Sequence, residues 1–198
     1  IQWLDNVNKV LSSLTQRFGR PANLTSLATS AAAEADALTS HLQALSEGLN
    51  TLPFETKEED REVYRFPQGD IPATLMDLSM ALLPSMGKLC DLVEQAHELL
   101  QEAVTGNADW QNAYEAEDWL VPVGQLQSRA LATRALFEDY ALGAGRPRRY
   151  ARWLNRNLYD VEMVSAPIEP GNILHEVLWQ RCYGCLLYTS DAADEGHC

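Results

Sequence analysis

The sequence predicts a mainly α-helical protein, with long antiparallel helices followed by a short β-hairpin and one more helix. Three observations predict this fold. Apolar residues recur at spacings of three and four through most of residues 1–142, which is typical of amphipathic helices. Gly or Pro residues end each of these stretches. After Gly145 the pattern changes to short β-prone stretches bounded by turn formers.

The first two helices are predicted from these stripes. Residues 2–18 carry apolar side chains on one face, and residues 19–21 (GRP) end that helix. A longer, Ala-rich helix begins at about residue 23 and stops at Pro53. The charge run at residues 55–62 (ETKEEDRE) is expected to be a solvated loop or an exposed helical turn.

The third helix follows a short irregular stretch. Residues 64–66 could be extended and residues 67–69 turn the chain, after which Asp70 is a plausible N-cap for a helix that reaches Val104. Pro84 lies inside this helix, and we expect it to kink the helix or split it in two.

The remaining elements are shorter. A fourth helix is predicted over residues 122–142 and ends at residues 143–145 (GAG). Residues 150–154 and 161–164 read as the two strands of a hairpin, and Asn172 could cap a short helix that runs to Trp179.

These patterns divide the chain into two zones and a tail. Residues 1–145 form the helical zone, and residues 146–184 form a strand–strand–helix piece. Because so small a piece cannot bury both its faces alone, we expect it to pack on a sheet outside this stretch of chain. Residues 185–198 begin with CLLYTSDAADE, which resembles the translation of a transposon-end sequencing adapter, so this tail is expected to be non-native.

The charge and the cysteines restrict the function. The formal net charge is -13, and because the tail holds three acidic residues and no Lys or Arg, residues 1–184 carry -10. Such a chain repels phosphate polyanions on average and could bind nucleic acid only through a local basic patch. No apolar run approaches the ~20 residues of a membrane span.

Without the tail only Cys90 and Cys182 remain, which indicates reduced thiols and a cytoplasmic protein. The CxxC formed by Cys182 and Cys185 is not taken as a redox or zinc motif, since Cys185 begins the adapter-like run.

Motifs of self-contained enzymes are missing from the sequence. It contains no GxxxxGK[ST] phosphate loop, no acidic magnesium box and no HExxH, and its His residues do not approach one another or a Cys at ligand spacing. We therefore predict no catalytic, cofactor-binding or metal-binding residue within the chain.

One basic segment stands out in this acidic chain. It holds five of the fifteen basic residues, interleaved with two aromatic residues. The candidate nucleic-acid contacts are Arg146, Arg148, Arg149, Arg152 and Arg156, with Tyr150 and Trp153 as secondary choices. Guanidinium groups bridge phosphates, and aromatic rings stack on bases. The alternative interpretation is a solvated turn and strand edge whose arginines pair with the acids of residues 109–118.

Two further groups have competing interpretations. Trp110, Tyr114 and Trp119 could form a binding plug, but packing in the core at the base of the helices is the preferred interpretation. The methionines of the third helix, Met76, Met80 and Met86, are expected to fill gaps in the core.

The order of several segments resembles one family, the DinG-type, XPD-like, ATP-dependent DNA helicases. Trp3 and Leu4 open a helix as at the start of that family's arch domain, and residues 64–72 (YRFPQGDIP) are similar to the segment before its next long helix. Residues 152–154 (RWL), 164–168 (VSAPI) and 174–179 (LHEVLW) are similar to its return into the first RecA-like motor domain.

The resemblance implies a fragment of a larger enzyme. Residues 1–145 would be the helical arch over a single-strand channel, and residues 146–184 an incomplete re-entry into motor domain 1. The parent would be an ATP hydrolase that binds single-stranded DNA, unwinds duplexes 5′ to 3′ and serves DNA repair. ATP and Mg²⁺ are implied for the parent only, and an iron–sulfur cluster or a fused exonuclease stays open.

Two alternatives remain. Arg152 and Trp153 could brace the motor sheet instead of touching DNA. A non-enzymatic helical interaction or scaffold domain is the rival function, although the stripes break at Pro21, Pro53 and Pro84. A helix protein of the membrane surface conflicts with the acidic charge.

Overall fold

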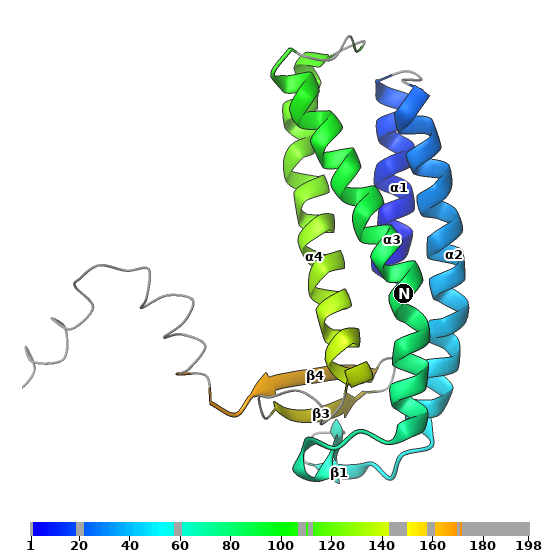
Figure 1. Ribbon diagram of the computed structural model, residues 1–198, viewed down its shortest axis with the longest axis vertical. Helices are drawn as coiled ribbons and strands as arrows, with labels where there is room; N and C mark the ends of the chain where they lie inside the picture. The colour runs from blue at the N-terminus through cyan, green and yellow to red at the C-terminus, as the bar shows by residue number, and fades with distance from the viewer. Residues whose placement is uncertain are drawn as a thin grey trace, which may run out of the picture.

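Four long helices stand side by side on a small β-sheet (Figure 1). The computed structural model describes residues 2–18, 22–57, 61–106, 110, 113–142, 150–157, 161–169 and 171. The helices are α1 (Gln2–Arg17), α2 (Ala22–Asn50), α3 (Ala73–Val104) and α4 (Ala116–Leu142). The prediction of a mainly helical fold with a small β element after the helices is confirmed.

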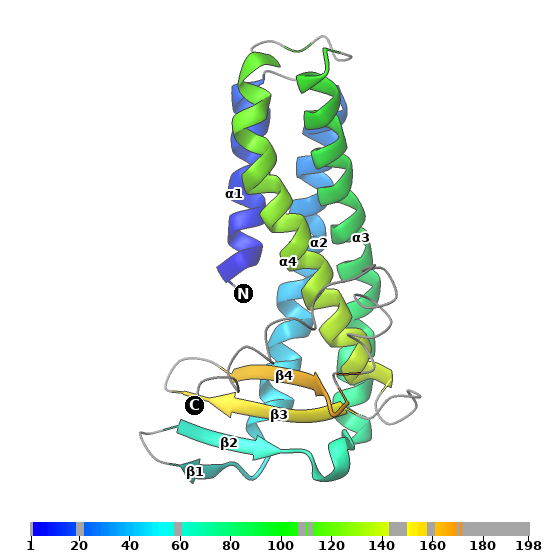
Figure 2. The ribbon, with the colours of Figure 1, turned by 90° about the vertical axis from the view of Figure 1, so that its left-hand side faces the viewer.

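The helices make a bundle with two different ends, which we call the tip and the foot. At the tip lie the end of α1 and the start of α2, together with the end of α3 and the start of α4, and the sheet lies at the foot (Figures 1 and 2). Helix α1 has 16 residues and α3 has 32, so α1 covers only the part of the bundle nearer the tip (Figure 2). None of the described helices combines the length and the apolar character needed to cross a membrane.

The sheet at the foot has four antiparallel strands in the order β1-β2-β3-β4. They are β1 (Glu55–Lys57), β2 (Arg61–Arg65), β3 (Tyr150–Arg156) and β4 (Val161–Pro167). The predicted hairpin is confirmed as β3 and β4, and both strands are longer than expected.

The first two strands overturn two expectations. Residues 55–57 and 61–62 belong to a β-hairpin and not to a solvated loop or a helical turn. The hairpin of β3 and β4 also finds its sheet within this chain, because β2 pairs with β3 through Tyr64 opposite Leu154. The charge run hid these strands, because eight consecutive polar residues show none of the apolar alternation by which a strand is recognised.

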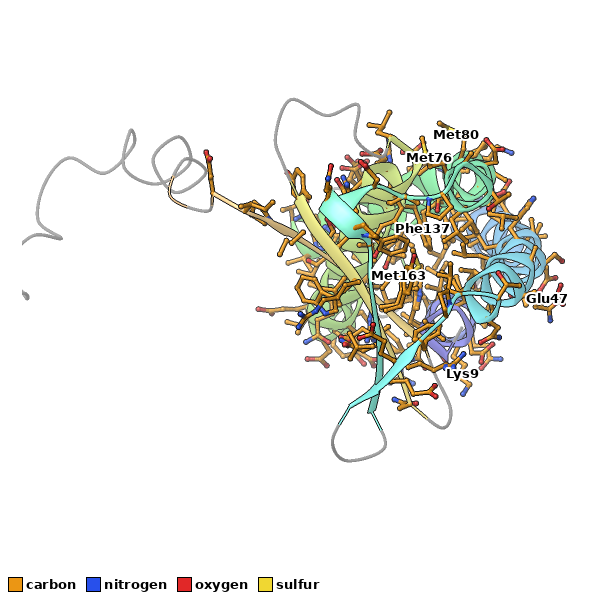
Figure 3. The ribbon with its side chains drawn as sticks, turned by 90° about the horizontal axis from the view of Figure 1, so that it is seen from below. Lys9, Glu47, Met76, Met80, Phe137 and Met163 are labelled. Atoms are coloured by element: carbon orange, nitrogen blue, oxygen red, sulfur yellow. The ribbon has the colours of Figure 1, made fainter. Side chains whose placement is uncertain are left out.

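One apolar core runs the length of the bundle and continues into the sheet. The stripes predicted on the helices form it, from Leu4 and Leu11 in α1 to Leu154 in β3. Seen from below, the side chains of the four helices converge on this core (Figure 3). Met86 is buried as expected, but Met80 is 48% exposed, so its assignment to the core was wrong.

The helix ends differ in detail from the prediction. Helix α3 is not split by Pro84, because Pro84 and Met80 both lie on its exposed side, where water can reach the carbonyl group that loses its partner. Asp70 is not the N-cap, since Pro72 holds that position and Asp70 ends the short 3₁₀ turn Pro67–Gly69. Helix α4 begins at Ala116, ahead of Pro122, and its first turn carries acids that suit a helix N-terminus.

Candidate nucleic-acid interface

The basic segment of the sequence leads from the foot of α4 into β3. Arg146, Arg148 and Arg149 fall outside the residues that the structure describes. Tyr150, Arg152, Trp153 and Arg156 are described and all lie on β3, which is an inner strand with β2 on one side and β4 on the other. For residues 150–156 the interpretation as a strand edge is therefore wrong.

Arg152 faces the helices and is buried. It shares its face of β3 with Leu154, because alternate residues of a strand point to the same side. Leu154 is 0% exposed and Arg152 is 4% exposed. A charged side chain at this depth needs a partner, since an unpaired charge loses its hydration without compensation.

The partner of Arg152 is Asp139 on α4, which is also 4% exposed. Nε of Arg152 donates to Oδ2 of Asp139 at 2.7 Å, and Nη2 donates to Oδ1 at 2.9 Å. Nη1 donates to the carbonyl oxygen of Gly69 at 2.7 Å, and the hydroxyl of Ser165 in β4 donates to Oδ2 of Asp139. This buried pair thus ties α4, β3, β4 and the turn before α3 to one another.

Gly69 lets that turn approach β3 closely. Its φ is +80°, in the region where side chains are strained. A Cβ at this position would lie 2.3 Å from the carbonyl oxygen of Tyr150. The predicted turn at residues 67–69 is confirmed, and the glycine is required both by its φ and by the lack of space.

Tyr140 makes a second link between α4 and the sheet. Its side chain is 0% exposed, and its hydroxyl donates to the carbonyl oxygen of Val164 at 3.0 Å and lies 3.3 Å from that of Trp153. Burial raises the pKa of Tyr140 well above its usual range. The phenol therefore stays protonated and can donate its hydrogen bond to the carbonyl oxygen of Val164.

The other described members of the segment are also engaged within the protein. Arg156 forms an ion pair with Glu62 of β2, and its guanidinium lies 4.0 Å from the ring centroid of Phe54. The ring of Tyr150 has the guanidinium of Arg152 at 5.5 Å from its centroid. Trp153 lies on the opposite face of the sheet and is partly buried. Arg152 therefore has a structural role. Arg156 links its own strand, β3, to the neighbouring strand β2 through Glu62.

One of the acids expected to neutralise this segment pairs with a different arginine. Glu115 ends the 3₁₀ turn Ala113–Glu115 directly before α4, whose start lies at the tip (Figure 1), and it forms an ion pair with Arg17 of α1. The ring centroid of Trp110 lies 5.2 Å from that of Phe18, and Trp119 packs against the core, so both are packing residues as preferred. Tyr114 is 80% exposed and does not share that role. The packing is at the tip and not at the base.

Sequence reasoning missed Asp139. A signal was present, because Asp139 sits among Phe137, Tyr140 and Ala141 at the end of an apolar helix, and all four are buried. A carboxylate among apolar neighbours calls for a buried cation, and Arg152 occupies the strand face that Leu154 identifies as inward.

Neither a metal centre nor a reactive thiol is found in the described part of the chain. No group of three or more His, Cys, Asp or Glu residues lies close enough there to hold a metal ion. Cys90 is a free, buried thiol, and burial raises its pKa, which keeps it from forming a thiolate. The helix expected over residues 172–179 and the CxxC lie outside the described residues.

The comparisons with known proteins give no family. No protein-family model matches the chain, and no curated protein matches it.

Proposed function

We propose that this chain is part of an ATP-dependent 5′ to 3′ DNA helicase of the DinG type, in which the helical bundle forms the arch over a single-strand channel. The order of the segments that resemble this family carries the proposal. Residues 64–72 run from β2 through the turn into the start of α3, residues 152–154 lie within β3, and residues 164–168 end β4. These three segments thus lie in the sheet or directly beside it.

The architecture is compatible with such a role. An arch has to hold its shape while a strand passes beside it, so it needs rigid rods that are fixed at one end. The four helices supply the rods, with one continuous core. The ion pair of Arg152 with Asp139 and the hydroxyl of Tyr140 fix the foot of α4 to the sheet. On this reading Arg152 braces the sheet, as the sequence allowed.

The chemistry of the reaction belongs to the parent enzyme. ATP supplies the energy and Mg²⁺ neutralises its phosphates, but the described residues provide no phosphate loop and no set of metal ligands. We therefore assign no step of hydrolysis to residues of this chain. Of the predicted strand contacts, Arg146, Arg148 and Arg149 stay with the proposal and lie outside the described residues.

The test has two parts. The coding sequence around this segment is expected to contain a phosphate loop and a DEAH box before Ile1, and a Ser-Ala-Thr motif soon after Gly184. The purified parent is expected to hydrolyse ATP faster when single-stranded DNA is added, and to unwind duplexes with a 5′ tail but not with a 3′ tail. A parent without ATP hydrolysis would refute the proposal and favour the scaffold alternative.

A further inference from the structure

The sheet at the foot has two faces, and Arg152 and Leu154 lie on the one that meets the helices. Cross-strand partners share a face, so the pairing of Trp153 with Arg65 and with Val164 puts these three residues on the other side, which we call the outer face. Figure 2 shows the strands in front of the lower part of α2, and no described helix covers the side of the sheet toward the viewer. The four described helices therefore leave the outer face without a covering layer.

The outer face is polar at one end and apolar at the other. At the start of β4, Nδ2 of Asn155 donates to Oε2 of Glu162 at 2.7 Å. Toward the end of β4 the face carries Trp153, Val164 and Ala166 instead. These three side chains are each partly buried, yet within the described part of the chain none of them packs on the core of the bundle. Apolar residues on both faces are typical of a sheet that is covered on both faces.

The chain that follows β4 contains a segment whose chemistry suits the apolar end of this face. Residues 172–179 (NILHEVLW) lie outside the described residues, and their sequence predicts a short amphipathic helix. At 100° per residue, four apolar residues of this segment fall within a sector of roughly 140°. They are Ile173, Leu174, Val177 and Leu178. So short a helix is not stable alone in water, so it requires a surface on which to bury that sector.

The position and the size of this segment also agree with the outer face. Residues 168–171 join it to the end of β4 and span at most about 14 Å. Gly171, the last residue that the structure describes, is already helical. A helix over residues 172–179 would be about 12 Å long, and strands β2 to β4 extend over about 10 Å. The inner face is closed to the segment, because α4 packs there through Asp139 and Tyr140.

We propose that the outer face is the docking surface for residues 172–179, which fold on it as an amphipathic helix with their apolar side against Trp153 and Val164. The sheet then lies between two helical layers, with the bundle on one face and this helix on the other. The chain's own segment is favoured over a separate partner, because its short connection to β4 keeps it at a high local concentration beside the face. The inference goes beyond the proposed function and does not depend on it.

Photo-crosslinking in the 198-residue chain tests where the segment lies. A photo-crosslinking residue replaces Ala151, which is exposed and lies on the outer face opposite Ala166. Tandem mass spectrometry is expected to locate the crosslinks in residues 172–179 of the same chain. The same residue in place of Asp36, exposed on α2, is the control and should not reach that segment. Crosslinks from position 151 that only join two chains, or none to residues 172–179, overturn the inference.

Urea unfolding of the same chain tests the contact itself. Val177→Ala is expected to lower the urea midpoint, whereas Glu176→Ala, on the polar side of the same helix, should leave it unchanged. In the background of Trp153→Ala the effect of Val177→Ala should fall by about half or more, because changes at two residues in contact are not additive. Equal midpoints for Val177→Ala and Glu176→Ala, or fully additive effects with Trp153→Ala, contradict the docking. ATP hydrolysis by the parent bears on the proposed function alone, so the two failures are distinguishable.

Discussion

The bundle carries an arginine–carboxylate pair at each end, and the two pairs have opposite surroundings. At the foot, the side chains of Arg152 and Asp139 are 3% and 6% exposed. At the tip, Arg17 pairs with Glu115, but the side chain of Arg17 is 55% exposed. The same chemical pair is therefore enclosed by protein at the foot and remains in contact with water at the tip.

This difference indicates that the foot of the bundle is fixed more firmly than the tip. A buried pair is costly to break, because the group left behind is a charge without water or partner. An exposed pair contributes little, because water and salt replace each partner. The foot is thus committed to one geometry, whereas the tip is held by apolar packing that includes the aromatic contact between Phe18 and Trp110.

The largest effect is expected when the pair at the foot is broken. Asp139→Ala leaves Arg152 buried without its carboxylate, and we expect the free energy of unfolding to fall by about 3–5 kcal/mol in urea titrations. The double variant Asp139→Leu with Arg152→Met is the control and should recover much of the loss. A loss below about 1 kcal/mol for Asp139→Ala would mean that water reaches Arg152.

The second effect concerns the turn that reaches β3. Gly69→Ala combines a positive φ with a Cβ placed 2.3 Å from a carbonyl oxygen, so we expect a loss of about 1–3 kcal/mol by thermal or urea unfolding. Gly87→Ala is the matched control, because that glycine lies within α3 and nothing is found within 4 Å of an added Cβ. The control should gain about 0.5–1 kcal/mol. Equal results for both alanines would contradict the close approach.

A smaller effect is expected from the hydroxyl that joins α4 to the sheet. Tyr140→Phe removes the hydrogen bond to Val164 and should cost about 1 kcal/mol at neutral pH.

The same variant tests the raised pKa of Tyr140. The folded protein holds the phenol protonated at a pH where the unfolded chain, with a pKa near 10, has lost that proton. The contribution of Tyr140 is therefore complete below pH 10 and declines as the pH rises through its raised pKa. Stability curves against pH should show a steeper alkaline decline in the wild type than in Tyr140→Phe. Parallel curves would mean that the phenol is hydrated.

The smallest effect is expected at the tip. Glu115→Gln removes the charge that pairs with Arg17, and we expect no resolvable change in the urea midpoint at physiological salt. The pKa of Glu115 is held below its usual range by the hydrogen bond from Arg17, so any stabilisation is present at neutral pH and is lost in acid. A midpoint that changes as much as in Asp139→Ala would abolish the contrast between foot and tip.

Periodicity in the sequence was sufficient to predict the long helices, but it did not predict how the helices contact the sheet. The stripes of α1, α2 and α3 become the core almost residue by residue, because a helix surrounded by partners must bury one face. Met80 does not follow this rule, because it lies outside the apolar stripe of α3 and a single apolar residue does not indicate which side of a helix is buried. Strand β1 and the start of β2 were missed because a short strand with many charges looks like a loop, whereas residues 64 and 65, expected to be extended, do lie in β2.

The candidate site shows the same limit. Composition identified the arginines of residues 146–156, but it could not tell Arg152, which points inward, from a residue that meets solvent. The inward direction is set by the register of β3 against β2 and β4. The apolar end of the outer face was not predicted, since it depends on Trp153 and Val164 being cross-strand partners.

The sequence by itself determined that four amphipathic rods and a hairpin would form, because spacing along the chain is a local property. It also determined that any phosphate-binding surface must be local in so acidic a chain. Only the tertiary structure decided that Asp139 neutralises Arg152, that β2 completes the sheet and that Trp153 and Val164 share its outer face. Those outcomes depend on residues far apart in the chain coming together, and no pattern within one segment specifies its distant partner.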